Sequence, residues 1–191
     1  MEKYPKPKQN NSEDIFDELM DYLKMIAIVV VVVFVLNEFV IINARIPSES
    51  MENTILVGDQ ILGNRLAYKF NDPQRYDIVI FRFPDDKSQY FIKRVIGLPG
   101  ETVEIRDGKV YIDGSDIPLD DSFCPETPKS RTSPGESEVY QVPDNCYFML
   151  GDNRNVSKDS RYWNNPYVIR EDILGKAVLR YWPITAFGLV D

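Results

Sequence analysis

The chain has 191 residues, enough for one compact domain and an attached segment. It contains no histidine, the side chain whose ordinary pKa lies near neutrality. This excludes a Ser-His-Asp triad, a Cys-His pair and any His-ligated metal site, so a hydrolase of this composition needs a carboxylate or a lysine as its base. Thirty acidic against 22 basic residues give a net charge of −8, which repels polyanions, and we expect no nucleic-acid partner.

The N-terminal part predicts a membrane anchor. Residues 1–24 are a polar tail, in which 1–12 are expected to be disordered and 13–22 alternate acidic and apolar side chains. Residues 25–42 contain 16 apolar residues among 18, and roughly 17 to 25 suffice to cross a bilayer. The alternative is a buried helix or strand of a soluble core, which five consecutive valines without an amphipathic period disfavour.

Basic residues are more frequent before the apolar run than after it. Lys3, Lys6, Lys8 and Lys24 precede the run, whereas Arg45 and Arg65 are the nearest basic residues behind it. The positive-inside rule then places the N-terminus in the cytoplasm and residues 46–191 outside. Because no small-residue cleavage site follows the run, we expect an uncleaved, single-pass protein of the cell membrane with the lipid bilayer as a partner.

Residues 46–191 have the pattern of a mainly β domain. The segments 77–83, 90–98 and 146–150 are short, β-branched or aromatic, and bounded by turn residues. Residues 102–114 alternate around Asp107-Gly108, a strong hairpin signal. No alternation of strands with helices appears, which disfavours a parallel sheet. Residues 115–137 carry prolines, serines and charges and are expected to form a loop insertion. Two cysteines, Cys124 and Cys146, are free or paired, and the sequence leaves both options open.

Three segments could carry chemistry, and the first is IPSESM at residues 46–51. If this segment is extended, Ser48 and Ser50 point to the same face, so one hydroxyl can attack while the other donates a hydrogen bond nearby. The alternative is structural, with Ser50 capping a short helix over residues 51–56. This segment alone does not distinguish the two.

The second segment, FIKRVIGLPGE at residues 91–101, contains a possible base. In a strand Lys93 shares a face with Phe91 and Val95, and Arg94 points to the other face. Burial lowers the pKa of a lysine by up to roughly 3 to 5 units. The alternative is that the Lys93 ammonium group reaches water. A buried Lys93 is the group best placed to replace the missing histidine.

The third segment, GDNRNVSKDSRYW at residues 151–163, has more Asp, Asn, Ser and Arg than a turn needs, and these groups can brace a site. It is not an EF-hand calcium loop, which needs glycine at its sixth position and glutamate at its twelfth. Counted from Asp152, those positions hold Ser157 and Trp163. The alternative is a polar surface loop.

Together and in this order, the three segments resemble the signature boxes of the bacterial type I signal peptidases, a family of Ser-Lys serine proteases. The boxes are S-x-S-M at 48–51, K-R-V-x-G-x-P-G-[ED] at 93–101 and G-D-N-R-x-x-S-x-D-S-R at 151–161. The resemblance implies a twisted antiparallel β domain preceded by one N-terminal transmembrane helix. It also implies removal of signal peptides from exported preproteins after a small-x-small sequence, with no cofactor and no metal.

The resemblance further implies roles for individual residues. Ser50 would be the nucleophile and Lys93 its general base, while the Ser48 hydroxyl and the Ser50 backbone N–H would form the oxyanion hole. Supporting roles fall to Ser157, which would position the lysine, and to the ion pair of Asp159 and Arg161. We expect apolar residues beside the pair to line shallow pockets that admit only small side chains, namely Ile46, Met51, Phe91 and Ile92.

The chain departs from the family pattern at two places. The family usually has S-M-x-P-T after the nucleophile, and Asn53 stands here in place of the proline. In the third box Asn155 and Val156 replace the usual Asp-Asn. Neither position carries the proton transfer, so we expect these changes to affect loop geometry rather than activity.

Two other functions are compatible with parts of the pattern. A self-cleaving repressor-type Ser-Lys protease has a similar catalytic core, but it would need a DNA-binding helix-turn-helix, which residues 1–45 do not offer. A membrane-anchored β domain that binds a partner without catalysis would leave Lys93 exposed and away from Ser50. The distance between these two side chains therefore discriminates enzyme from binding protein.

Overall fold

The computed structural model describes residues 12–124, 126–133 and 135–190. It divides into two compact units, a helical unit that ends at Phe39 and a β domain that begins at Val40. Residues 1–11 of the expected polar tail, positions 125 and 134 of the expected insertion, and residue 191 lie outside the described residues.

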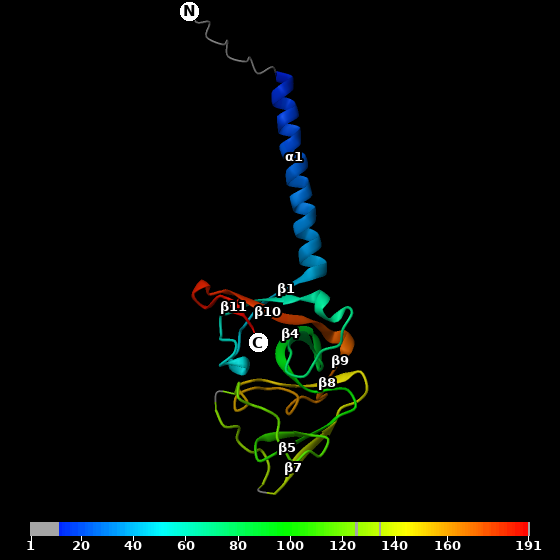
Figure 1. Cartoon of the computed structure of the whole chain (residues 1–191), viewed down its shortest axis with the longest axis vertical. Coiled ribbons are helices and arrows are strands. Elements are labelled where there is room, and N and C mark those ends of the chain that lie inside the picture. The colour runs from blue at the N-terminus through cyan, green and yellow to red at the C-terminus, as the bar shows by residue number, and fades with distance from the viewer. Residues whose placement is uncertain (1–11, 125, 134, 191) are drawn as a thin grey trace, which may run out of the picture. The chain divides into compact units, whose positions relative to one another are not determined.

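The helical unit contains one long helix, α1 (Ser12–Val35), which continues into a π-helical turn at Leu36–Val40 (Figure 1). The stretch Ile15–Val40 is long and apolar enough to cross a membrane. The expected amphipathic lead-in and the apolar run thus form a single helix. It ends before residue 42, because Ile41 and Ile42 already belong to the first strand of the β domain.

The β domain is built around an eight-stranded sheet in which neighbouring strands run antiparallel. Its order is β1-β2-β10-β3-β4-β8-β9, with β11 beside β10. The strands are β1 (Ile41–Arg45), β2 (Gln60–Asn64), β3 (Ile78–Phe83), β4 (Asp86–Gly97), β8 (Cys146–Leu150), β9 (Tyr167–Ile169), β10 (Ile173–Trp182) and β11 (Gly188–Leu189). Short 3₁₀ helices connect them at Glu49–Met51, Arg65–Tyr68, Arg170–Asp172 and Ile184–Ala186. The expectation of a mainly β, antiparallel fold is confirmed.

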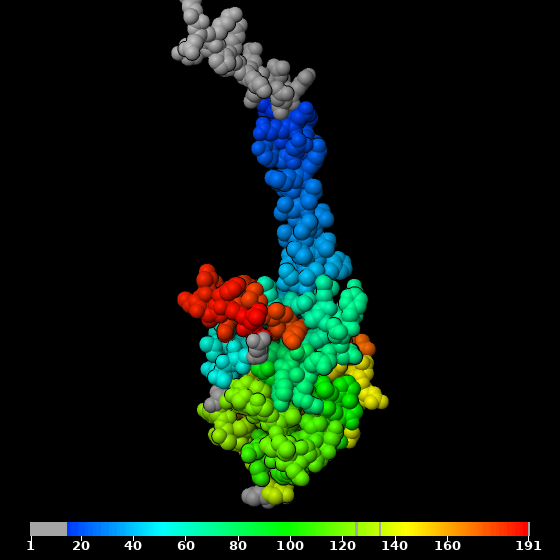
Figure 2. Space-filling view, viewed as in Figure 1, coloured from blue at the N-terminus to red at the C-terminus, as the bar shows by residue number. Residues whose placement is uncertain are grey.

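A second sheet has the order β6-β5-β7, formed by β5 (Thr102–Arg106), β6 (Lys109–Ile112) and β7 (Ser137–Gln141). Asp107 and Gly108 join β5 to β6 with φ angles of 50° and 77°, as a two-residue hairpin turn requires, so the expected hairpin is confirmed. The long connection from β6 to β7 contains no strand among its described residues. Its lime-green atoms cover part of the visible face of the β domain in Figure 2.

The central strands are buried on both faces, and this places polar side chains in the interior. Alternate residues of β3 enter two different apolar clusters, with Ile78 and Ile80 in one and Val79 and Phe81 in the other. Strand β4 pairs with β3 on one edge and with β8 on the other, and the side chains of its C-terminal half are buried. Any cation in this part of β4 must be paired or lose its charge.

Candidate active site

Ser50 lies in a tight turn that follows β1. Residues Glu49–Met51 form a 3₁₀ helix, so the expectation of an extended segment is wrong here. The alternative is also wrong, because no helix covers residues 51–56. In this turn the side chain of Met51 is fully buried, with no exposed surface. The two serine hydroxyls nevertheless stay together, with Ser48 Oγ 3.3 Å from Ser50 Oγ.

Lys93 reaches Ser50 from the middle of the sheet. It lies in β4, is only 4% exposed, and its Nζ donates hydrogen bonds to Ser50 Oγ at 2.6 Å and to the Ile92 carbonyl at 2.9 Å. The side chain therefore does not extend to water. Strand β4 and the turn before residue 52 bring together two side chains that are 43 positions apart in the sequence.

The environment of Lys93 favours its neutral form. Burial lowers the pKa of Lys93 from 10.5 to about 8, although the negative charges of Asp159 and Asp152 oppose this shift. No described carboxylate lies within ion-pair distance of the amine. At pH 8 about half of the Lys93 side chains are then neutral, whereas an ordinary lysine would be neutral in roughly one molecule in 300. The geometry and the pKa together suit a general base.

The loop after β8 packs directly on the nucleophile turn. The Asn153 backbone N–H donates to the Ser50 carbonyl at 3.2 Å. A Cβ at Gly151 would lie 2.3 Å from both that carbonyl oxygen and Ser157 Oγ, so only glycine allows this approach. Ser157 Oγ is buried and has no hydrogen-bond partner among the described residues. Ser157 therefore forms no hydrogen bond with Lys93 here, and its role in positioning the lysine stays a prediction.

The expected pair of Asp159 and Arg161 is present. Arg161 donates to the two carboxylate oxygens of Asp159 from Nε at 2.8 Å and from Nη2 at 2.9 Å. Asp159 also accepts the Gly151 backbone N–H at 3.0 Å. The pair thus holds the loop at the point where it leaves β8, close to the nucleophile turn.

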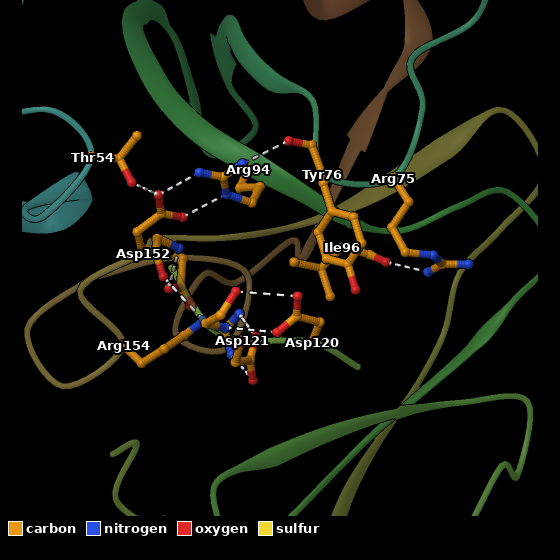
Figure 3. A network of polar contacts seen from close by, with 12 residues as sticks. Thr54, Arg75, Tyr76, Arg94, Ile96, Asp120, Asp121, Asp152 and Arg154 are labelled. Atoms are coloured by element: carbon orange, nitrogen blue, oxygen red, sulfur yellow. Dashed lines mark hydrogen bonds and ion pairs between the residues drawn. The ribbon is translucent and has the colours of Figure 1, made fainter. Parts of the chain in front are cut away.

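A second buried ion pair was not predicted from the sequence. Arg94, the neighbour of Lys93, donates to both carboxylate oxygens of Asp152 at 2.9 and 2.7 Å (Figure 3). The Thr54 hydroxyl donates to the same carboxylate at 2.5 Å. Asp152 therefore ties the nucleophile turn to β4. The sequence did contain a signal for this pair. Arg94 follows Lys93 in a strand and therefore points to the opposite face, where a buried arginine needs a charged partner of its own.

The apolar residues expected to line substrate pockets are mostly internal. Ile46, Met51 and Ile92 belong to one buried apolar cluster. Phe91 is half-buried, stacks on Phe83 with ring centroids 4.5 Å apart, and lies 5.4 Å from the Lys93 amine. Their role in substrate binding stays a prediction.

Neither cysteine forms a disulfide, so Cys124 and Cys146 are free thiols. Burial raises the pKa of Cys124 to about 11, which keeps this thiol protonated. Among residues 12–124, 126–133 and 135–190, no group of three Cys, Asp or Glu side chains is arranged to hold a metal ion.

An antiparallel β domain with a serine hydroxyl beside a buried lysine is the arrangement expected of serine proteases that use a lysine base. The model of the family described as "Signal peptidase, peptidase S26" matches residues 19–182. The chain therefore belongs to the S26 signal peptidase family.

Known proteins with similar sequences agree with this family. Signal peptidase I of Leptolyngbya laminosa is 40% identical over 177 residues, which cover 89% of this chain and 83% of the relative. Probable signal peptidase I-2 of Synechocystis sp. (strain ATCC 27184 / PCC 6803 / Kazusa) is 36% identical over 190 residues, covering 97% and 82%. A crystal structure of a signal peptidase I from Enterococcus faecalis V583 is 37% identical, with a TM-score of 0.45 over 56% of this chain and 97% of that chain.

Proposed function

We propose that this protein is a membrane-anchored signal peptidase I, in which Ser50 is the nucleophile and Lys93 the general base. It is a serine endopeptidase that removes signal peptides from preproteins. The observation that carries the assignment of the dyad is the 2.6 Å separation of Lys93 Nζ and Ser50 Oγ, at a lysine that is 4% exposed. A binding domain without catalysis has no need of a buried lysine at this distance from a serine.

The reaction follows from the two side chains. Neutral Lys93 accepts the proton of Ser50 Oγ as the oxygen attacks the carbonyl carbon of the scissile bond. The Lys93 ammonium then protonates the departing amine, which leaves an acyl-enzyme on Ser50. Water hydrolyses this ester, with Lys93 again accepting a proton. The residues present supply each proton transfer without histidine.

The oxyanion of the tetrahedral intermediate needs hydrogen-bond donors. The Ser48 hydroxyl and the Ser50 backbone N–H are the proposed donors, and the proximity of Ser48 Oγ to Ser50 Oγ, 3.3 Å, supports this assignment. Ser157, Asp159 and Arg161 are proposed to support the lysine and the loop around it. No cofactor takes part in this scheme.

The protein is anchored in the membrane by its N-terminal apolar helix. We infer that residues 1–24 lie on the cytoplasmic side, that the lipid bilayer surrounds the apolar part of the helix that ends at Val40, and that the β domain, with its long connection from β6 to β7, lies outside the cytoplasm. The excess of lysines before the run supports this orientation. The net charge of −8 disfavours a nucleic-acid partner.

Cleavage of a preprotein in detergent tests the dyad. We expect Ser50→Ala and Lys93→Ala to reduce kcat/KM by on the order of a thousandfold or more, because each removes a group that takes part in the reaction. Ser88→Ala and Lys109→Ala are the controls, since both residues lie in strands and are exposed. We expect them to stay within about twofold of the wild type. Undiminished cleavage by Ser50→Ala or Lys93→Ala would refute the proposed roles.

Protease protection tests the orientation separately. A protease added to spheroplasts or protoplasts, whose cell membrane is intact, should digest the β domain and leave the N-terminal tail undigested. Digestion of the tail alone would reverse the proposed topology.

A further inference from the structure

One part of the loop insertion contacts all three segments of the candidate active site. We call residues 119–124 and 126–131 the strap. It leaves β6 with a hydrogen bond from the Leu119 N–H to the Val110 carbonyl at 2.7 Å. The strap lies outside the reacting groups, and nothing in the family pattern described above assigns it a role. Its contacts with the site fall into three groups.

The first contact is with the nucleophile turn. Asn53 Nδ2 donates a hydrogen bond to the Phe123 carbonyl at 2.8 Å. Asn53 has a φ of 88°, in the left-handed region that asparagine adopts more readily than most residues. Proline, with its φ held near −65°, cannot take this conformation. Asn53, in place of proline, therefore allows the left-handed backbone of this turn and also bonds the turn to the strap.

The second contact is with β4. The ring of Phe123 lies 4.2 Å from the guanidinium of Arg94, the residue that holds Asp152, and its edge-to-face neighbour is Tyr76 at 5.8 Å. An aromatic face attracts a cation, and this attraction is stronger where water is excluded. Phe123 thus covers the buried pair of Arg94 and Asp152 from the side of the strap.

The third group of contacts is with the loop after β8. Asp121 accepts two hydrogen bonds from Arg154, at 2.6 and 3.1 Å (Figure 3), and Arg154 Nε donates to the Gly151 carbonyl at 3.1 Å. Asn155, the second departure from the family pattern, accepts from the Lys129 N–H at 2.9 Å and donates to the Thr127 carbonyl at 3.3 Å.

Both departures from the family pattern therefore point an amide side chain at the same segment of the insertion. We propose that the strap positions the nucleophile turn and the loop after β8 against β4, with Asn53 and Phe123 as positioning residues for the reaction. This inference rests on the proposed roles of Ser50 and Lys93. These two side chains come from separate segments, and a displacement of about 1 Å between reacting groups costs roughly a hundredfold in rate.

Asn53→Gly tests the first contact in full-length enzyme with a preprotein substrate. Glycine readily adopts the left-handed backbone and removes the side chain that bonds the Phe123 carbonyl. We expect kcat to fall about tenfold while KM stays within about twofold, because the strap acts on the position of Ser50 rather than on substrate binding. The matched control is Asn145→Gly, since Asn145 is also left-handed, with a φ of 60°, but its amide contacts Glu171. We expect its kcat to stay within about twofold of the wild type.

Phe123→Leu and Phe123→Tyr test the second contact. Leucine keeps apolar bulk but removes the aromatic face, whereas tyrosine keeps the face, and Phe123 is partly exposed so that a hydroxyl can reach water. We expect Phe123→Leu to lose about tenfold in kcat and Phe123→Tyr to retain at least about half of it. If Phe123 acted only through packing, the loss of activity in each variant would follow its loss of stability. Thermal unfolding of the same samples measures that stability.

The strap proposal is overturned if Asn53→Gly and Phe123→Leu both keep kcat within about twofold, or if their losses match their unfolded fractions at the assay temperature. It is also overturned if Phe123→Tyr is as impaired as Phe123→Leu. Failure of the proposed dyad is a separate result, because it would appear as activity in Ser50→Ala.

Discussion

Two neighbouring basic residues of β4 are buried on opposite faces of the strand, and their charges are handled differently: one is paired with a carboxylate and the other is not. Lys93 and Arg94 are consecutive, and each is 4% exposed. Arg94 donates two hydrogen bonds to Asp152, whereas no described carboxylate is within ion-pair distance of Lys93. Arginine does not lose its proton in proteins, so its burial requires a partner. Lysine can lose its proton, so burial without a partner makes it a base.

The difference separates a structural role, that of Arg94, from the proposed catalytic role of Lys93 on a single strand. The pair of Arg94 and Asp152 secures the nucleophile turn through Thr54, while the unpaired burial of Lys93 lowers its pKa to about 8. Each arrangement would fail on the other face. A charge-paired lysine would stay protonated, and an unpaired arginine would remain a buried charge.

Lys93→Arg is expected to have the largest effect, because it places a permanent charge at the position of the proposed base. An arginine at this position cannot accept the proton of Ser50, so we expect kcat/KM for preprotein cleavage to fall on the order of a thousandfold. Lys87→Arg, an exposed position in the same strand, is the control. Substantial activity in Lys93→Arg would mean that another group is the base.

Asp152→Asn removes the buried ion pair between Asp152 and Arg94. It replaces the carboxylate that pairs with the buried Arg94 by a neutral amide, while the Tyr76 carbonyl still accepts a hydrogen bond from Arg94 at 2.9 Å, and we expect the free energy of unfolding to fall by about 3 kcal/mol. Urea unfolding followed by tryptophan fluorescence measures this loss. Glu104→Gln is the control, since Glu104 pairs with Arg106 in a more exposed position and should matter by less than about 1 kcal/mol. Equal losses in the two variants would contradict the buried-pair interpretation.

Lys93→Met should stabilise the protein below pH 8 while removing its activity. The pKa of Lys93 is lower in the folded than in the unfolded protein, so the unfolded state binds more protons and wild-type stability rises with pH between about 8 and 10.5. At pH 6 the buried charge costs the wild type about 3 kcal/mol, which methionine avoids. Urea unfolding at pH 6 and pH 10 measures the difference, which should shrink at the higher pH. A less stable Lys93→Met at pH 6 contradicts this account.

The pH dependence of the wild type gives the smallest of these effects. Only the neutral form of Lys93, the proposed base, can accept a proton, so we expect kcat/KM to rise about tenfold per pH unit below pH 8 and to level off above it. Between pH 6 and pH 9 the increase should be roughly a hundredfold. Initial rates of preprotein cleavage across this range provide the test. A rate that keeps rising tenfold per unit above pH 9 would show that burial does not lower the pKa of the base.

Local pattern predicted the strands well but not the turn at the nucleophile. The alternation around Asp107-Gly108 predicted the hairpin because a two-residue turn depends on its own residues. The segment around Ser50 was misjudged because burial of Met51 and Ile55, both without exposed surface, shapes the chain there. The predicted boundary of the anchor at residue 42 lies beyond the end of the helix for a similar reason. Ile42 is as apolar as the residues before it, but it is buried in the core of the β domain.

By itself the sequence determined the chemistry that this protein has available. A chain without histidine, with serine after an apolar run and lysine among apolar neighbours, leaves Ser50 and Lys93 as the candidate pair. Only the tertiary structure decided that the lysine is buried, that it lies 2.6 Å from Ser50, and that Arg94 beside it is paired with Asp152. The reason is physical. A pKa and a hydrogen-bond distance depend on which distant segments exclude water from a side chain, and no local pattern specifies those segments.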